Sequence, residues 1–332
     1  MSDARGGKVL LKKLGTLVVG LAEAAVVLAL GFALLGLLAR WHWLLDLVAQ
    51  FRMQYFCAAL VGLFLFGVRR RWVWTGVCGL AALVMGVSMA GYWFPWRGES
   101  GDGGEALETL KIINFNVYTR NTRYDDVMAF LQVEDADVVL LLEYNWQWAS
   151  HLEKLRELYP HQVGQTRTGS FGIRLFSKIP FAESGVRVIG KLGAPSVDVV
   201  LGERGGGIRL FGTHPAPPRS GELSQLRNEQ LVVMGGYLES FRDDRMIVAG
   251  DFNVSPFSPH FREFLQATGL RDSARGFGLK PTWNRRAPWI TVPIDHVLVS
   301  SGIDVLEHRV GPAFGSDHHP VIVTLGLRNV VD

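Results

Sequence analysis

The chain has 332 residues, of which 48% are hydrophobic, and a formal net charge of +3. This length allows one large domain and a further part, and the apolar residues are concentrated in the first 95 positions. Those positions hold 9 of the 34 Lys and Arg but only 3 of the 31 Asp and Glu, so the rest of the chain carries about −3. That balance excludes a large basic face of the kind that duplex-binding proteins present.

Three apolar stretches, 14–38, 51–68 and 72–94, each approach the roughly 20 residues that a helix needs to cross a bilayer. We therefore predict a membrane anchor over residues 1–96 with three transmembrane helices; the alternative is a buried helical hairpin of a soluble protein. Tryptophans beside the first and third stretches suit the headgroup boundary: Trp41, Trp43, Trp72, Trp74, Trp93 and Trp96. Glu23 is the one acid inside a stretch, which makes it a functional candidate unless it lies near the interface.

The distribution of cations predicts the orientation, because short loops rich in Lys and Arg stay in the cytoplasm. Seven cations precede the first stretch or separate the second from the third, and three occupy the other side: Arg5, Lys8, Lys12, Lys13, Arg69, Arg70 and Arg71 against Arg40, Arg52 and Arg97. We expect a multi-pass protein of a bacterial inner membrane with a cytoplasmic N-terminus. Everything after the third helix is then periplasmic or extracellular.

Residues 97–108 are rich in Gly and acid and are predicted to be a linker. The rest of the chain, 109–332, alternates short apolar runs with amphipathic segments, which predicts an α/β domain. Both cysteines, Cys57 and Cys78, lie in the apolar stretches, so this domain has no disulfide. We expect strands at 111–117, 138–143, 172–177, 197–201, 208–213, 246–250, 295–300 and 321–325, and helices at 124–133, 146–158, 222–241 and 259–268. Several strands are apolar throughout, which indicates sheets buried on both faces.

Polar residues recur at the ends of these apolar strands, where a rigid scaffold delivers reactive groups. One Asn or Asp at a strand end needs no explanation beyond a turn. Here such residues form a set of oxygen ligands and acid–base groups that suits a hard cation: Asn116, Glu143, His214, Asp251, Asn253, Asp295, Asp317 and His318. Asn116 could instead simply cap a strand, and Glu143 could be a surface acid. An acid that ends the apolar run "VVLLL" would, however, be costly to desolvate without a partner.

The motifs "FNV", "LLLE", "GTHPAPP", "GDFNVSP", "IDHVLVS" and "GSDHHP" resemble, in order and spacing, the endonuclease/exonuclease/phosphatase superfamily, which includes deoxyribonuclease I and neutral sphingomyelinases. The resemblance covers roughly residues 110–328. The anchored arrangement is also similar, more loosely, to a bacterial subgroup acting on lipid-linked cell-wall precursors. The resemblance implies an α/β fold with a two-sheet sandwich, and a Mg²⁺-dependent phosphoester hydrolase in which Mn²⁺ is a possible substitute.

The same resemblance implies a role for each residue. Glu143 would be the main Mg²⁺ ligand, with Asn116 ordering the metal site and Asp317 close to the ion. Asp251 would position or deprotonate the attacking water, and Asn253 would bond a nonbridging phosphate oxygen. His318 would be the general acid–base catalyst, oriented by Asp295. His214 would protonate the leaving group or stabilise the charged transition state. Leu142 departs from the family, which usually has Gln before the metal-binding Glu.

Three functions remain open on the sequence. The favoured one is a phosphoester hydrolase that acts at the lipid bilayer on a phosphorylated lipid, since anchoring keeps the site near membrane substrates. The second is an anchored nuclease, for which the acidic domain gives no electrostatic help in binding nucleic acid. The third is a non-catalytic binding module of the same fold. A zinc site at the "SDHHP" histidines lacks a cysteine or third histidine to complete a tetrahedral set.

Overall fold

The structure is a computed structural model that describes residues 2–94, 108–202, 206–242, 245–283, 287 and 289–327, with side chains from Leu10 onward. The chain divides into two compact units, Met1–Ala90 and Gly91–Asp332. Each unit is described by itself. The predicted linker at 97–108 lies outside the described residues except for Glu108, so its extent stays a prediction.

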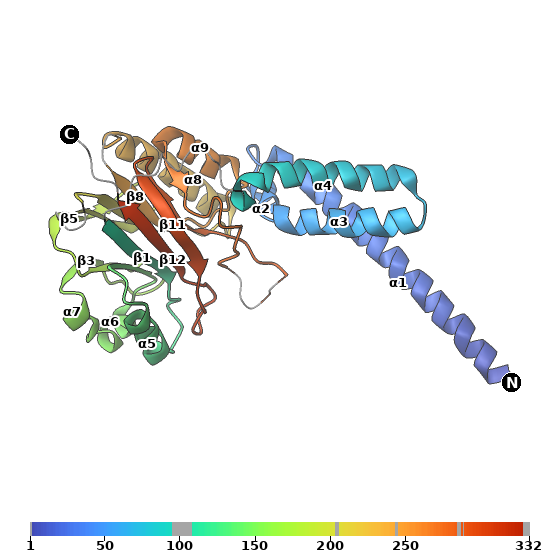
Figure 1. The fold of residues 1–332 in the computed structure, drawn as a ribbon, viewed down its shortest axis with the longest axis horizontal. Helices are drawn as coiled ribbons and strands as arrows, with labels where there is room; N and C mark the ends of the chain where they lie inside the picture. Colours follow the sequence, from blue (N-terminus) through green and yellow to red (C-terminus); the bar gives the residue numbers. More distant parts are fainter. Residues whose placement is uncertain are drawn as a thin grey trace. The chain divides into compact units, whose positions relative to one another are not determined.

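The first unit is helical (Figure 1). Its elements are α1 (Ser2–Leu35), η1 (Gly36–Leu38), α2 (Trp43–Ala49), α3 (Arg52–Val68) and α4 (Trp72–Trp93). Two described helices, Leu10–Leu38 and Trp72–Trp93, are long and apolar enough to cross a membrane. The pair α2 and α3 is bent by 58° and makes a third span only if both are counted as one. The prediction of three spanning helices is therefore unconfirmed.

The buried Glu23 of α1 forms ion pairs with two exposed arginines of the turn that joins α3 to α4. Its carboxylate lies 3.1 Å from Arg71 Nη1 and 3.4 Å from Arg69 Nη1. The helices approach closely here because Gly62 has no side chain: a Cβ at that position would lie 2.6 Å from Val26 Cγ1. Glu23 therefore has a packing role, neutralising two cations of the turn.

The second unit contains two mixed six-stranded sheets. The first has the order β11-β12-β1-β2-β4-β3 and the second β5-β6-β7-β8-β10-β9. Their strands are β1 (Glu108–Asn116), β2 (Val138–Leu142), β3 (His161–Gln165), β4 (Ile173–Ser177), β5 (Phe181–Val188), β6 (Pro195–Leu201), β7 (Arg209–Thr213), β8 (Met246–Asp251), β9 (Arg271–Asp272), β10 (Asp295–Val299), β11 (Ile303–Val310) and β12 (Val321–Leu327). The pairs β1/β2 and β7/β8 are parallel, and the other neighbours are antiparallel.

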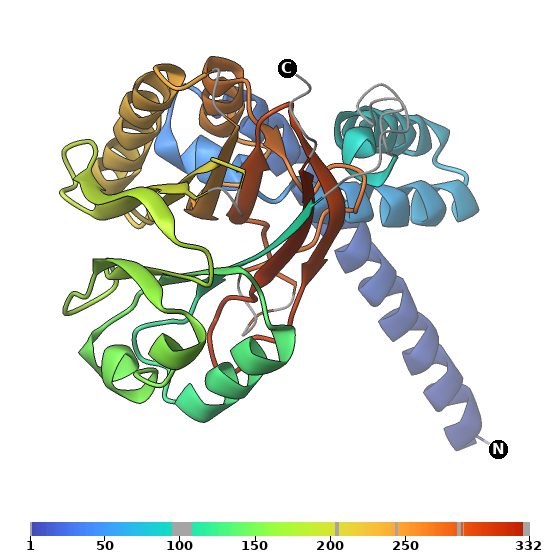
Figure 2. The same cartoon turned by 60° about the vertical axis from the view of Figure 1, so that its left-hand side comes forward.

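Helices cover the outer faces of both sheets (Figures 1 and 2). The first sheet packs against α5 (Tyr124–Glu134), α6 (Trp146–His151) and α7 (Leu155–Leu158), and the second against α8 (Gly221–Glu239) and α9 (Pro259–Thr268). The inner faces form one apolar core that includes Ile112, Leu140, Leu210 and Ala249. The predicted two-sheet α/β sandwich is confirmed, with its central strands buried on both faces.

Local sequence explains where the helices begin and end. Ser220 and Ser258 each accept a backbone N–H in the first turn of the following helix, and Pro259 occupies the first position of α9, where no donor is required. Gly269 ends α9 in a left-handed conformation. The predicted helix at 146–158 is instead broken into α6 and α7.

The strands that the sequence did not reveal are β3, β5, β9 and β11, and these are the four edges of the two sheets. Edge strands are open to solvent along one side and lack the continuous apolar run of a central strand. β5, for example, is exposed or half-buried along its whole length. Their polar sequences therefore hid them from a search based on apolar runs.

Candidate active site

Parallel pairing brings the polar strand ends together. Asn116, the last residue of β1, pairs with Leu142, the last residue of β2. Glu143 follows Leu142 in the chain and therefore lies at the same end of the sheet as Asn116. In the other sheet Thr213 pairs with Gly250, which places His214 beside Asp251. β7 and β8 approach so closely at this point that a Cβ on Gly250 would lie 2.0 Å from the Thr213 carbonyl oxygen. The carboxyl ends of both parallel pairs supply the candidate site.

One amide links the two sheets across the site. Asn116 Nδ2 lies 3.3 Å from Glu143 Oε1 and 3.1 Å from Asp251 Oδ2. The Thr119 backbone N–H donates to Glu143 Oε2 at 2.8 Å, and Glu143 itself has a φ of 58°. Such a left-handed backbone is uncommon for a residue other than glycine and often marks a functional position. The carboxylates at 143 and 251 therefore converge on the same space.

Asp251 and Asn253 form a tight turn after β8. The Asn253 backbone N–H donates to Asp251 Oδ1 at 2.9 Å, and Asn253 has a φ of 52°. Its side-chain Nδ2 donates to the Pro215 carbonyl at 3.0 Å, which ties the turn to the segment that carries His214. An Asx turn supports this geometry, since Asn tolerates the left-handed region.

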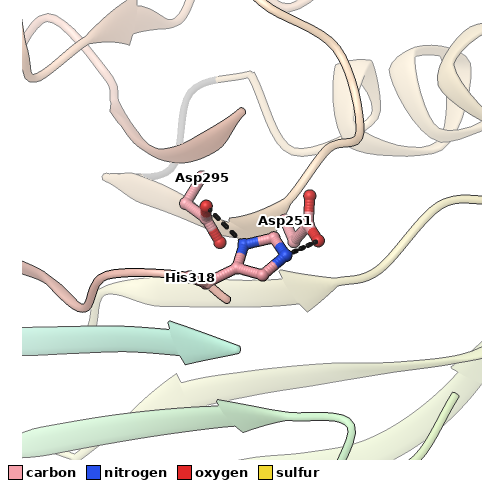
Figure 3. A group of neighbouring side chains, drawn as sticks. All are labelled: Asp251, Asp295 and His318. Carbon is pink, nitrogen blue, oxygen red and sulfur yellow. Dashed lines mark hydrogen bonds and ion pairs between the residues drawn. The ribbon is translucent and has the colours of Figure 1, made fainter. Parts of the chain in front are cut away.

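Two histidines flank the Asp251 carboxylate. His318 lies between two acids, with Nδ1 2.9 Å from Asp295 Oδ2 and Nε2 3.6 Å from Asp251 Oδ2 (Figure 3). His214 Nε2 is 3.4 Å from the same Asp251 oxygen. All four side chains are buried. Asp251 Oδ2 is thus shared by Asn116, His214 and His318.

The mutual electrostatics set the protonation states. Burial disfavours charge on His318, but Asp295 and Asp251 outweigh it and raise its pKa to about 10. Burial also opposes charge on Asp251, yet His318 and His214 lower its pKa to about 2. The pKa of His214 is raised by its hydrogen bond to Asp251 against the effect of burial. Burial raises the pKa of Asp295, with His318 opposing. The favoured arrangement at neutral pH is a charged His318 beside an ionised Asp251.

Two hydroxyls that the sequence analysis did not single out hold this arrangement. Ser316 Oγ donates to the Asn116 carbonyl at 2.7 Å and accepts the His318 N–H at 3.0 Å. Thr282 Oγ1 accepts the Asp295 N–H at 3.1 Å. The sequence does not reveal these contacts, because Ser316 reaches Asn116 across 200 positions and Thr282 reaches Asp295 across 13.

Asp317 is half-buried, and its Oδ1 has no hydrogen-bond partner among the described residues. Within the described part of the chain, no hydrogen bond connects Asp317 to Glu143. His296 and His319, beside Asp295 and His318, instead bond the carbonyls of Val254 and Gly311. The structure thus brings seven of the eight predicted site residues together around Asp251 and its neighbours, and Asp317 lies at the margin.

The residues suit a divalent cation. Asp251, Asp295 and His318 offer ligand atoms within 4.8 Å of one another, so this buried group could hold an ion. Hydrogen bonding within the same trio, however, favours an acid–base pair over a ligand set. Glu143 accepts one hydrogen bond at each carboxylate oxygen, and each oxygen keeps a further lone pair. The unpaired Asp317 oxygen adds another hard ligand.

Residues 113–318 match the Endonuclease/Exonuclease/phosphatase family. The chain therefore belongs to this family, whose members are phosphoester hydrolases. None of the curated proteins matches it significantly.

Solved structures share the fold at low identity. Humanized TDP2 of D. rerio has a TM-score of 0.55 and 21% identity, covering 65% of this chain and 98% of that one. An endonuclease/exonuclease/phosphatase from Beutenbergia cavernae has a TM-score of 0.55 and 21% identity, covering 66% and 72%. Sphingomyelinase C from Streptomyces griseocarneus has a TM-score of 0.50 and 20% identity, covering 66% and 99%.

Proposed function

We propose that this protein is a membrane-anchored, Mg²⁺-dependent phosphoester hydrolase that acts outside the cytoplasm on a lipid-linked phosphate, pyrophosphate or phosphodiester. The observation that carries the catalytic part is the sharing of Asp251 Oδ2 by the Asn116 amide and the imidazoles of His214 and His318. This arrangement puts one ionised carboxylate among donors that can stabilise a phosphoryl group.

The chain's own residues divide the chemistry as follows. Asp251 orients the attacking water and accepts its proton as the water oxygen bonds to phosphorus. Asn253 keeps its amide oriented by bonding Pro215, and its other N–H can then bond a nonbridging oxygen. Glu143 would be the principal ligand of Mg²⁺, assisted by Asn116 and Asp317. When bound, the ion neutralises phosphate charge and acts as a Lewis acid.

The two histidines act on the phosphoryl oxygens and on the leaving group. A His318 whose pKa is raised to about 10 is protonated at neutral pH and suits an acid better than a base. It stabilises the negative charge that develops on the phosphoryl oxygens, and Asp295 keeps its ring oriented. His214, held by the same Asp251 oxygen, supplies the proton that the leaving oxygen takes as its bond to phosphorus breaks.

A lipid substrate is favoured by two features. Two described helices are long and apolar enough to cross a bilayer, and as an anchor they would keep the domain at a membrane. Trp289 and Ile290, shortly before Val292, are 76% and 45% exposed. An exposed Trp next to an aliphatic residue suits the bilayer interface.

Val292, two residues after Ile290, is connected to the candidate site through Trp283. Trp283 and Val292 exchange backbone hydrogen bonds, and Trp283 also forms a β-bridge with His318. A substrate held at the membrane surface would therefore be near the reacting groups. Sphingomyelinase C, named for a lipid, shares the fold.

A panel of substrates tests the proposal. Purified full-length protein in detergent or vesicles is incubated with Mg²⁺ and with a polyprenyl pyrophosphate, a phospholipid, plasmid DNA and single-stranded DNA. We expect turnover of a lipid substrate and its loss in Glu143→Ala. Because a TDP2 structure of the same fold contains a single-stranded DNA product, cleavage of DNA alone would establish the nuclease alternative. No turnover of any substrate would leave the non-catalytic module.

A further inference from the structure

The turn that carries Asp251 and Asn253 is held from behind by two buried cationic side chains. Arg227 of α8 donates from Nη1 to the Asn253 carbonyl at 3.0 Å. His296 of β10 contacts the next carbonyl, that of Val254, with Nε2 at 3.0 Å. Both side chains are buried, Arg227 completely. Consecutive carbonyl oxygens of the catalytic turn are thus each bonded by a different element.

His296 must carry a proton on each ring nitrogen to make these contacts. Its Nε2 faces a carbonyl, and its Nδ1 lies 3.3 Å from Asp272 Oδ2. A carbonyl and a carboxylate both accept hydrogen bonds, so a doubly protonated ring suits both contacts; burial opposes this charge, but Asp272 outweighs it and raises the pKa of His296. Phe252 and Phe261 surround it at ring-centroid distances of 5.5 and 4.3 Å, which fixes its plane.

His296 and the catalytic Asp295 are neighbours on β10, so their side chains point to opposite faces of the sheet. Asp295 faces His318. His296 faces the apolar layer under α9, where Phe252, Phe261 and Phe264 pack. Arg227 and His296 therefore act on the turn from the side opposite to the chemistry, and neither bonds His214, His318 or Glu143 in the described part of the chain.

We propose that Arg227 and His296, with Asp272 as the counter-ion of His296, form a carbonyl clamp whose role is to position Asp251 and Asn253 for hydrolysis. Charge-assisted hydrogen bonds hold a backbone more firmly than neutral ones. Two of them on successive carbonyls fix the left-handed conformation of Asn253 (φ 52°). They therefore also fix the N–H that bonds Asp251 Oδ1. This inference rests on the proposed function for its catalytic consequence but not for its structural one.

Conservative variants test the clamp. Arg227→Met and His296→Phe approximately keep the volume and remove the donors, while Arg227→Lys and His296→Gln each retain an N–H donor group. Matched controls alter two other buried polar residues that do not bond the turn in the described part of the chain: Gln230→Met on α8, and His308→Phe on β11 of the other sheet, whose ring bonds Ser273. Full-length protein is assayed with Mg²⁺ and bis-p-nitrophenyl phosphate, a soluble phosphodiester.

A displaced catalytic group costs roughly 100-fold in rate for about 1 Å of movement. We expect Arg227→Met and His296→Phe to lower kcat roughly 10- to 100-fold with a smaller change in KM, because neither replaced side chain itself touches the substrate. Arg227→Lys should recover part of the loss. The two controls should keep the parental kcat.

Amide hydrogen exchange over residues 246–258 provides a readout that needs no turnover. The clamp variants should exchange faster than the parent in this segment, and the controls should not. If the parent is inactive on every substrate, the proposed function fails while the exchange data still test the clamp. Parental kcat in folded clamp variants, or parental exchange in the segment, overturns the inference. If the Met and Phe variants do not fold, the Lys and Gln variants decide by the same two measurements.

Discussion

Replacing Asp295 by asparagine removes the charge that orients His318 and leaves the shape of the side chain unchanged. Asp295 Oδ2 is 2.9 Å from His318 Nδ1, and both groups are buried. An asparagine at this position either accepts from Nδ1–H without a charge or turns its amide and donates to Nδ1. In the second case the ring keeps its proton only on Nε2. Both outcomes weaken the imidazolium that the proposed mechanism requires.

The size of the effect follows from the second carboxylate. Loss of an orienting aspartate costs roughly 10⁴-fold in kcat in serine-protease triads. Here Asp251 Oδ2 lies 3.6 Å from the other ring nitrogen and continues to favour the charged ring. We therefore expect Asp295→Asn to lower kcat by roughly 10²- to 10³-fold, or about 3–4 kcal/mol of transition-state stabilisation.

The substitution should also shift the pH profile of kcat in a defined direction. Asp295 is the strongest of the groups that raise the pKa of His318 to about 10, so removing its charge lowers that pKa. If protonated His318 is the active form, activity is present below this pKa and is lost as the pH rises through it. The alkaline limb of the kcat profile must then move to lower pH in Asp295→Asn.

The assay is kcat against pH with Mg²⁺ and bis-p-nitrophenyl phosphate for the parent and Asp295→Asn. Asp304→Asn, on the edge strand β11, serves as the control for loss of an acid from the domain. An alkaline limb that does not move, or a kcat within a few-fold of the parent, would refute the role given to Asp295 and His318. A change of the acidic limb alone would instead identify His318 as a general base.

The remaining predictions concern the ion, the membrane and stability. Glu143→Gln should raise the Mg²⁺ concentration for half-maximal activity roughly 100-fold or more, since it removes a ligand and not an outer-shell partner; an unchanged Mg²⁺ titration would remove Glu143 from the site. Replacing Trp289 and Ile290 by alanine should reduce turnover of a lipid in vesicles and spare that of a soluble diester, and equal losses on both would contradict membrane contact. Burial lowers the pKa of His308 to about 4. The folded state therefore excludes a proton that the unfolded chain binds below about pH 6.5, so stability is complete above that pH and falls by roughly 3 kcal/mol toward pH 4. Denaturant titrations from pH 4 to 8 should show this loss in the parent and a smaller one in His308→Phe.

The sequence by itself determined the central strands and the family. Strands such as β2 and β8 are buried on both faces, so each leaves an unbroken apolar run that ends at a polar residue. Such runs can be recognised from consecutive residues of the sequence. The polar residues at their ends, such as Glu143 and Asp251, are therefore identified together with the runs. The same reasoning could not find the edge strands, because exposure on one side removes the apolar signal.

The tertiary structure alone decided what surrounds each reactive group. Thr119, Ser316 and Arg227 bond the site through backbone atoms of distant segments, and no residue pattern encodes such a contact. The sequence also gave Glu23 as a functional candidate, whereas the fold pairs it with Arg69 and Arg71. Apolar periodicity is a property of neighbours along the chain, so it can be recognised from the sequence alone. Hydrogen-bond partners and shifted pKa values depend on distances between segments, and these exist only once the two sheets have packed.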